Sequence, residues 1–148
     1  MTRGEALAAL VAFPARLEAW AAALPAEELR QRPSVEAFAP LEQVWHLAEL
    51  EVVFGQRLAR LRDEAEPHLP DWRGDLAAVE GRYLERDLGD GLRAFRAARQ
   101  ANLAAFASLA GAQWARRGTQ EGVGDVDLDG LPTRMAEHDA GHAAEMGL

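Results

Sequence analysis

The stretch PLEQVWHLAELEVVFGQRLARL, residues 40–61, decides the fold that we predict for this chain. Its apolar residues cover more than one flank of a helix, whereas a surface helix shows one apolar stripe. Proline is well tolerated in the first turn of a helix. A long helix that is apolar on several sides is expected inside a bundle. We therefore predict a buried helix over residues 40–64.

Apolar spacing predicts three further long helices. The first covers residues 4–24, where apolar residues recur at steps of three and four. The third covers about 90–110, with Asp87 or Asp90 as its N-cap and Gly111 as its stop signal. The last begins after Asp129 as N-cap. Residues 66–76 and 116–130 are predicted to be loops, and no segment has the pattern of a strand.

The expected fold follows from these four helices. We predict an all-α protein, a four-helix bundle in a single domain of residues 1–148. The connection between the second and third helices is long, with a short helical piece around 76–86, so it is expected to cross over the bundle.

Composition argues against several kinds of partner and chemistry. The net charge of −8 disfavours nucleic acids and anionic membranes. All 16 basic residues are arginine, which excludes a Schiff-base lysine and a P-loop lysine. The absence of cysteine excludes disulfides and thiolate metal sites. With no secretory signal and no apolar run of membrane-spanning length, we expect a soluble cytoplasmic protein.

Two histidines near the end of the chain are candidate metal ligands. Leu131 and Met135 begin a helical stripe that continues in His138 and His142. Because the first members are apolar, the stripe should face the core. Residues four apart stand one above the other on a helix, so both imidazoles can point at one ion.

A third ligand has two candidates. His46 lies among apolar residues of the second helix. It is either the third metal ligand or a core histidine bonded to one carbonyl or carboxylate. His68 lies between prolines and is expected to be a solvated loop residue.

The sequence HDAGH, 138–142, approximates the HExxH motif of zinc proteases. Asp139 replaces the glutamate that serves as general base, and only six residues follow His142. Both features disfavour a zinc protease.

The stretches ELRQRPSVEAFAPLEQVWHLAELE, 28–51, and MAEHDAGH, 135–142, resemble the DinB-like superfamily. This group also contains YfiT-type metal hydrolases and the bacillithiol S-transferases. The resemblance implies a four-helix bundle with a long crossover, and a metal site made of His46, His138 and His142. The segment EAFAP and the residue Gly141 depart from the family pattern.

Such a site would hold a divalent metal ion, and imidazole ligands suit both Zn²⁺ and Ni²⁺. The resemblance favours a metal-dependent S-transferase or hydrolase that acts on a small-molecule substrate, with a low-molecular-weight thiol such as bacillithiol as cosubstrate. Arg96 and Arg99 are candidates for binding an anionic group, or else solvated charges on an outer face.

The alternative function is a non-catalytic metal-binding module of the stress response. It predicts a closed site with a fourth protein ligand, Glu49 or Glu145. Trp72 is a candidate lid over the pocket, and the resemblance also allows a homodimer.

Overall fold

The computed structural model describes all 148 residues, and four long helices dominate it. They are α1 (Arg3–Ala22), α2 (Pro40–Asp63), α4 (Leu88–Ala107) and α5 (Leu131–Met146). The shorter elements are α3 (Gly74–Glu80), three 3₁₀ turns (Ala26–Glu28, Tyr83–Glu85, Gly111–Ala115) and three strands. The four-helix bundle predicted from the sequence is confirmed.

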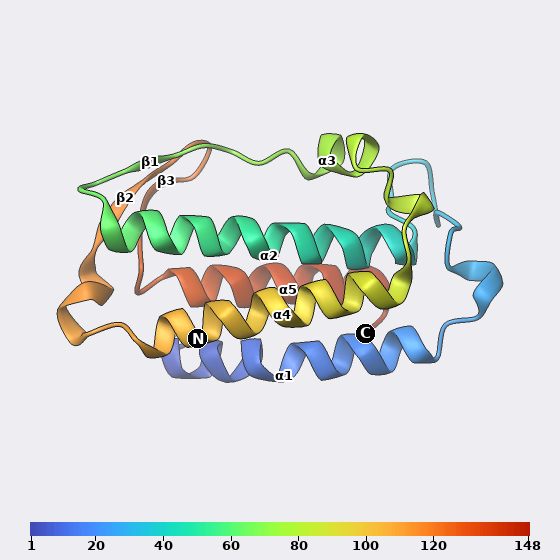
Figure 1. Cartoon of the computed structure of the whole chain (residues 1–148), viewed down its shortest axis with the longest axis horizontal. Coiled ribbons are helices and arrows are strands. Elements are labelled where there is room, and N and C mark those ends of the chain that lie inside the picture. Colours follow the sequence, from blue (N-terminus) through green and yellow to red (C-terminus); the bar gives the residue numbers. More distant parts are fainter.

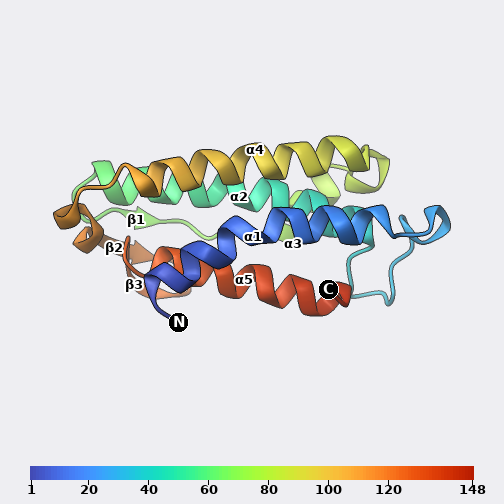
Figure 2. The same cartoon turned by 90° about the horizontal axis from the view of Figure 1, so that it is seen from below.

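The helices run in two directions. Figure 1 shows α1 and α5 running one way and α2 and α4 running the other. Each of α2 and α1 packs against both α4 and α5, as Figures 1 and 2 show from two sides. The connection from α2 to α4 therefore returns along the length of the bundle before α4 begins, which is the predicted long crossover.

Three short strands form a small sheet at the end of the bundle where α2 ends and α5 begins (Figure 1). Strand β1 (His68–Leu69) pairs in parallel with β2 (Arg117–Gln120), which pairs antiparallel with β3 (Gly124–Asp127). The prediction that residues 66–76 and 116–130 contain no strand is wrong. The inward-facing residues of β2 are Gly118 and Gln120 rather than large apolar ones, so the alternation that identifies a strand is missing.

Two predicted helix ends also differ from the structure. The residue at the N-cap of α5 is Gly130, whose backbone N–H donates to Asp127 at 2.7 Å, so Asp129 is not the cap. Helix α4 ends at Ala107 with Ser108 as its C-cap, before Gly111. Its N-cap is Asp87, which accepts from the backbone N–H of Asp90.

The core has two apolar clusters with a polar layer between them. On α4, Arg99 falls between Phe95 of one cluster and Phe106 of the other. On α5, Asp139 falls in the same way between Ala136 and Ala143. The layer lies at the level of the histidines of α5, so it bears on how the candidate site is held.

No helix of the structure combines the length and the apolar character needed to cross a membrane.

Candidate metal centre

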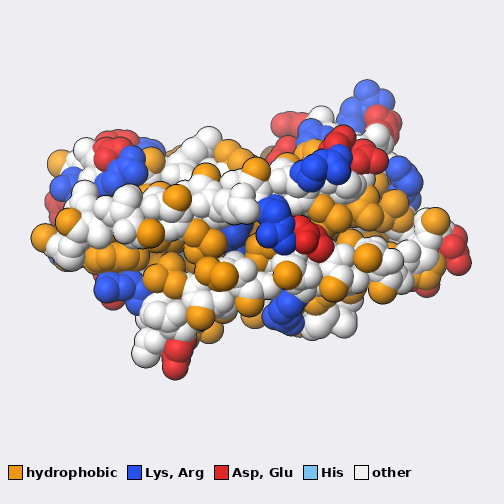
Figure 3. Space-filling view, turned by 60° about the horizontal axis from the view of Figure 1, so that its bottom comes forward, with side chains coloured by type: hydrophobic (Ala, Val, Ile, Leu, Met, Phe, Trp, Pro, Cys, Tyr) orange, Lys and Arg blue, Asp and Glu red, His pale blue; other side chains and the backbone are white.

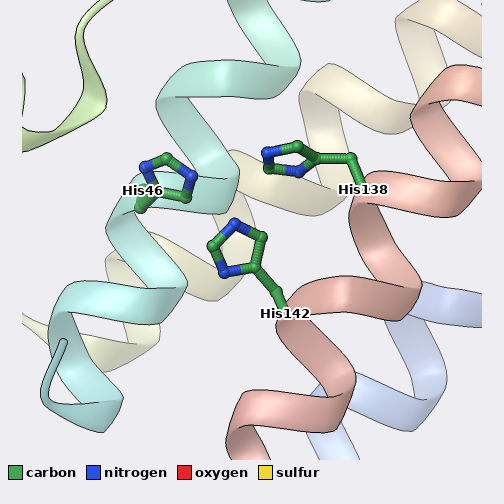
Figure 4. Close-up of side chains that lie close together, drawn as sticks. All are labelled: His46, His138 and His142. Atoms are coloured by element: carbon green, nitrogen blue, oxygen red, sulfur yellow. The ribbon is translucent and has the colours of Figure 1, made fainter. Parts of the chain in front are cut away.

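Three histidines from two helices meet inside the bundle. His46 comes from α2, and His138 and His142 come from α5, as Figure 4 shows. One ring nitrogen from each of the three lies within 4.8 Å of the others. The ring centroids of His138 and His142 are 4.5 Å apart, and those of His46 and His142 are 4.6 Å apart. These are the three ligands that the family resemblance implied, and the fold brings them together.

The imidazoles are buried or half-buried, and two of them are short of hydrogen-bond partners. Both ring nitrogens of His46 and the Nδ1 atom of His138 are buried with no partner in the protein. Burial, together with the neighbouring imidazoles, lowers the pKa of His46 to about 3 and that of His138 to about 4. At neutral pH these rings are uncharged and present lone pairs. Orphaned lone pairs converging on one point fit a metal ion, because a metal ion would satisfy them.

A side chain of α2 orients His142. The Nδ1 atom of His142 lies 2.7 Å from Oε1 of Gln43, while Nε2 of Gln43 donates to Glu145 at 2.9 Å. Because the carboxylate can only accept, the amide oxygen of Gln43 is left to accept from Nδ1–H of His142. The lone pair of His142 is then on Nε2. This is the arrangement by which outer residues fix the tautomer of a metal-binding histidine.

The crossover closes over His46. A Cβ atom on Gly74 would lie 2.7 Å from Cε1 of His46, so only glycine allows this backbone to approach the ring so closely. Trp72 and Phe38 flank the same ring, with centroid distances of 5.5 Å and 5.3 Å. Trp72, the predicted lid, therefore lies directly against the site.

A buried ionic cluster ties α5 to its neighbours. Arg99 of α4 donates to both carboxylate oxygens of Glu51 at 2.7 and 3.0 Å, and to Asp139 at 3.0 Å. It also donates to the backbone carbonyl of Leu10. Since Asp139 directly follows His138, this cluster fixes the position of α5 relative to α2.

Of the two arginines of α4, Arg99 fits neither expectation, whereas Arg96 agrees with the expectation of a charge on an outer face. Arg99 is neither on an outer face nor open to a substrate, because it is 1% exposed and held by two carboxylates. Arg96 forms a half-exposed ion pair with Glu18. The sequence alone does not show that Arg99 is buried and paired, because its carboxylate partners come from other helices.

The two acidic residues suggested as a fourth ligand point elsewhere. Glu49 accepts from the hydroxyl of Tyr83 and pairs with Arg86 at 3.3 Å. The side chain of Glu145 is 61% exposed and lies 3.4 Å from Nδ1 of His142, the nitrogen that faces Gln43. His68 is exposed on β1 and contacts Thr119 at 2.8 Å, in agreement with the solvated position expected for it.

A cavity of about 500 Å³ adjoins the histidines. His46 and His138 form part of its wall, and Leu50, Phe54 and Trp72 supply the apolar part. Its volume is in the range of small-molecule sites. His142 lines a different cavity, together with Gln43 and Glu145.

The sequence profile of the DinB superfamily matches residues 9–146. The match therefore covers most of a chain that forms a four-helix bundle with a long crossover and brings three histidines together. The chain belongs to the DinB superfamily.

Solved structures agree with this assignment at the level of the fold. YfiT from Bacillus subtilis, described as a probable metal-dependent hydrolase with an unusual four-helix bundle topology, superposes with a TM-score of 0.84 at 16% identity. The match covers 98% of this chain and 85% of YfiT. The four-helix bundle protein TT2238 gives a TM-score of 0.73 at 24% identity, covering 99% of this chain and 98% of TT2238.

A mycothiol-dependent maleylpyruvate isomerase gives a TM-score of 0.80 at 9% identity. The match covers 99% of this chain but only 61% of the isomerase, which is therefore a longer protein. At these identities the similarities establish the fold alone. No curated protein matches the sequence.

Proposed function

We propose that this protein is a divalent-metal-dependent S-transferase or hydrolase whose metal ion is held by His46, His138 and His142. The observation that carries the proposal is the convergence of three imidazoles, one nitrogen of each within 4.8 Å of the others, with two of them at the wall of a cavity. Zinc and nickel both suit such ligands. A divalent ion with three imidazole ligands supplies a Lewis acid that lowers the pKa of a bound thiol or water molecule.

The surroundings of the histidines support an open catalytic site over a closed structural one. A structural ion takes four protein ligands, whereas a catalytic ion keeps a position for substrate. Glu49 and Glu145 are held by other partners, so neither closes the site. The alternative of a non-catalytic metal-binding module predicted Glu49 or Glu145 as its fourth ligand, so these contacts favour the open site.

Two similarities favour thiol transfer over hydrolysis as the reaction. One structural neighbour is mycothiol-dependent, and the family resemblance includes the bacillithiol S-transferases. The chain has no cysteine of its own, so a nucleophilic sulfur must come from a cosubstrate. In such a transfer the thiol loses its proton to solvent, its sulfur bonds to an electrophilic carbon, and the leaving group departs with the bonding electrons.

The chain's own residues would orient the reactants and exclude water. Gln43 holds His142 in one tautomer, and the Arg99 cluster fixes α5. Trp72 and Gly74 cover His46. Together they preorganise the site before a substrate enters.

A thiol-conjugation assay tests the proposal. Zinc-loaded and nickel-loaded protein would be incubated with monochlorobimane and, in turn, bacillithiol, mycothiol and glutathione, and the fluorescent thioether would be followed. We expect turnover with at least one thiol, its loss in His46→Ala, and its retention in His68→Ala. The absence of conjugation with every combination of metal and thiol would contradict an S-transferase. If the protein also failed to hydrolyse ester and amide probes, the non-catalytic metal-binding module would be the remaining function.

A homodimer and a cytoplasmic location stay predictions.

Figure 3 shows the side of the bundle formed by α1 and α4, where hydrophobic side chains run between groups of charged ones and no histidine is visible. The candidate site therefore does not open onto this side.

A further inference from the structure

Two arginines line the cavity beside the histidines. Arg57 comes from α2, and Arg134 comes from α5, one helical turn before His138. They reach the same cavity wall as His46 and His138. Neither was recognised from the sequence, because a single arginine on a helix usually marks a solvated face.

Both guanidinium groups lack the carboxylate partner that a buried arginine normally has. Arg57 is only 8% exposed, yet it forms no ion pair and lies 5.7 Å above the ring of Phe54. Arg134 donates from Nη2 to Oε1 of Gln120 at 2.6 Å, while its Nη1 atom is buried with no acceptor. Arg99, which is buried like Arg57, shows the contrast, because two carboxylates hold it.

Neither positive charge is therefore paired directly with a carboxylate. Burial lowers the pKa of both groups, and Arg134 lowers the pKa of Arg57 further. Asp71 and Glu137 face the same cavity and act in the opposite direction, but their effects are smaller than that of burial. Two like charges held together in a partly desolvated cavity are stabilised when an anion binds between them.

We propose that Arg57 and Arg134 bind the carboxylate of a small organic acid whose reactive carbon faces the histidines. The planar fork of arginine matches the two oxygens of a carboxylate. Gln120 fixes Arg134 so that Nη1 stays free to donate. The apolar wall of Leu50, Phe54 and Trp72 would receive the carbon skeleton. This inference deepens the proposed function and rests on it for the reaction, although not for the binding of the acid.

The test follows binding rather than turnover. Propionate would be titrated into ¹⁵N-labelled protein, as purified and again after removal of metal, and the indole N–H signals of the four tryptophans would be recorded. Only Trp72 lines the cavity, so its signal is expected to shift and saturate while the others stay in place. Propionamide, which has the same shape without the charge, is expected to cause no saturable shift.

Substitutions identify the residues responsible. Arg57→Gln and Arg134→Gln are each expected to weaken propionate binding at least tenfold. Arg62→Gln removes an arginine of α2 that is paired with Asp63 and is expected to leave binding unchanged. Because neither cavity arginine is paired directly with a carboxylate, their glutamine variants should melt at or above the temperature of the unsubstituted protein without ligand. Arg134→Lys, which keeps the charge but loses the fork, should bind several-fold more weakly.

Four results would overturn the inference: no saturable shift, an equal response to propionamide, unchanged binding in both glutamine variants, or tighter binding of inorganic phosphate than of propionate. Each of these results concerns the binding of the acid and not the reaction. Failure of the thiol-conjugation assay with intact propionate binding would refute the S-transfer reaction and leave the carboxylate site standing.

Discussion

Gln43 of α2 accepts a hydrogen bond from the Nδ1 atom of His142 at 2.7 Å, across the interface between α2 and α5. The same helix carries His46 one turn later, so one face of α2 supplies both a candidate ligand and the group that orients another. Outer partners of this kind contribute strongly to metal affinity.

Replacing this acceptor should weaken metal binding. We expect Gln43→Leu to lower zinc affinity roughly 10- to 100-fold, because His142 loses its fixed tautomer. A competition titration with a chromogenic chelator measures the change. Gln56→Leu, at an exposed position of the same helix, serves as the control. Equal affinities of both variants would show that Gln43 has no orienting role.

Two glycines near the site should respond in opposite ways to alanine. Gly74→Ala would place a Cβ atom 2.7 Å from His46, so the ring must move and metal affinity should fall. A Cβ on Gly141, within α5, would meet no atom within 4 Å. Gly141→Ala should therefore raise the free energy of unfolding by about 0.5–1 kcal/mol through helix propensity. Urea unfolding and chelator competition on both variants check this, and a destabilised Gly141→Ala would contradict it.

Removing the cation of the buried cluster should be far more damaging than removing an exposed one. Arg99→Met leaves Glu51 and Asp139 buried without their partner, and a loss of about 3–5 kcal/mol in the free energy of unfolding is expected. Arg96→Met breaks a half-exposed pair with Glu18 and should cost less than about 1 kcal/mol. Similar losses in both variants would mean that the cluster does not hold α5.

The metal-free protein should lose stability in mild acid. The pKa of His46 is lowered from 6.5 to about 3, and that of His138 to about 4, so the unfolded chain binds protons at these residues first. The stabilisation is fully present above pH 6.5 and is lost as the pH falls toward the folded values. Between pH 7 and pH 5 we expect a loss of about 2 kcal/mol per histidine. Urea unfolding at several pH values measures it, and His46→Gln should reduce the slope.

The sequence predicted the helices and the histidine pair of α5 because both leave a periodic signal, and the family resemblance implied His46 as the third ligand. His138 and His142 continue an apolar stripe, and His46 lies in a helix that is apolar on several sides. Gln43 could have been found in the same way, since it stands three residues before His46 on one helical face.

The remaining site residues leave no such signal. Arg57 and Arg134 look like any solvated arginine until the fold places them in one cavity. Gln120, which orients Arg134, lies on a strand whose inward positions are not apolar. The pairing of Arg99 with Glu51 and Asp139 depends on how three helices pack. Long-range contacts of this kind are set by tertiary structure and not by local pattern.

Metal content is the most direct test of the central claim that imidazoles from α2 and α5 bind one divalent ion. Protein purified without added metal would be analysed for its elements, alongside His46→Ala and the exposed-histidine control His68→Ala. We predict close to one zinc or nickel ion per chain in the unsubstituted protein and in His68→Ala, and loss of most of it in His46→Ala. Full metal occupancy in His46→Ala, or no metal bound to the unsubstituted protein even after zinc and nickel are supplied, would contradict the account.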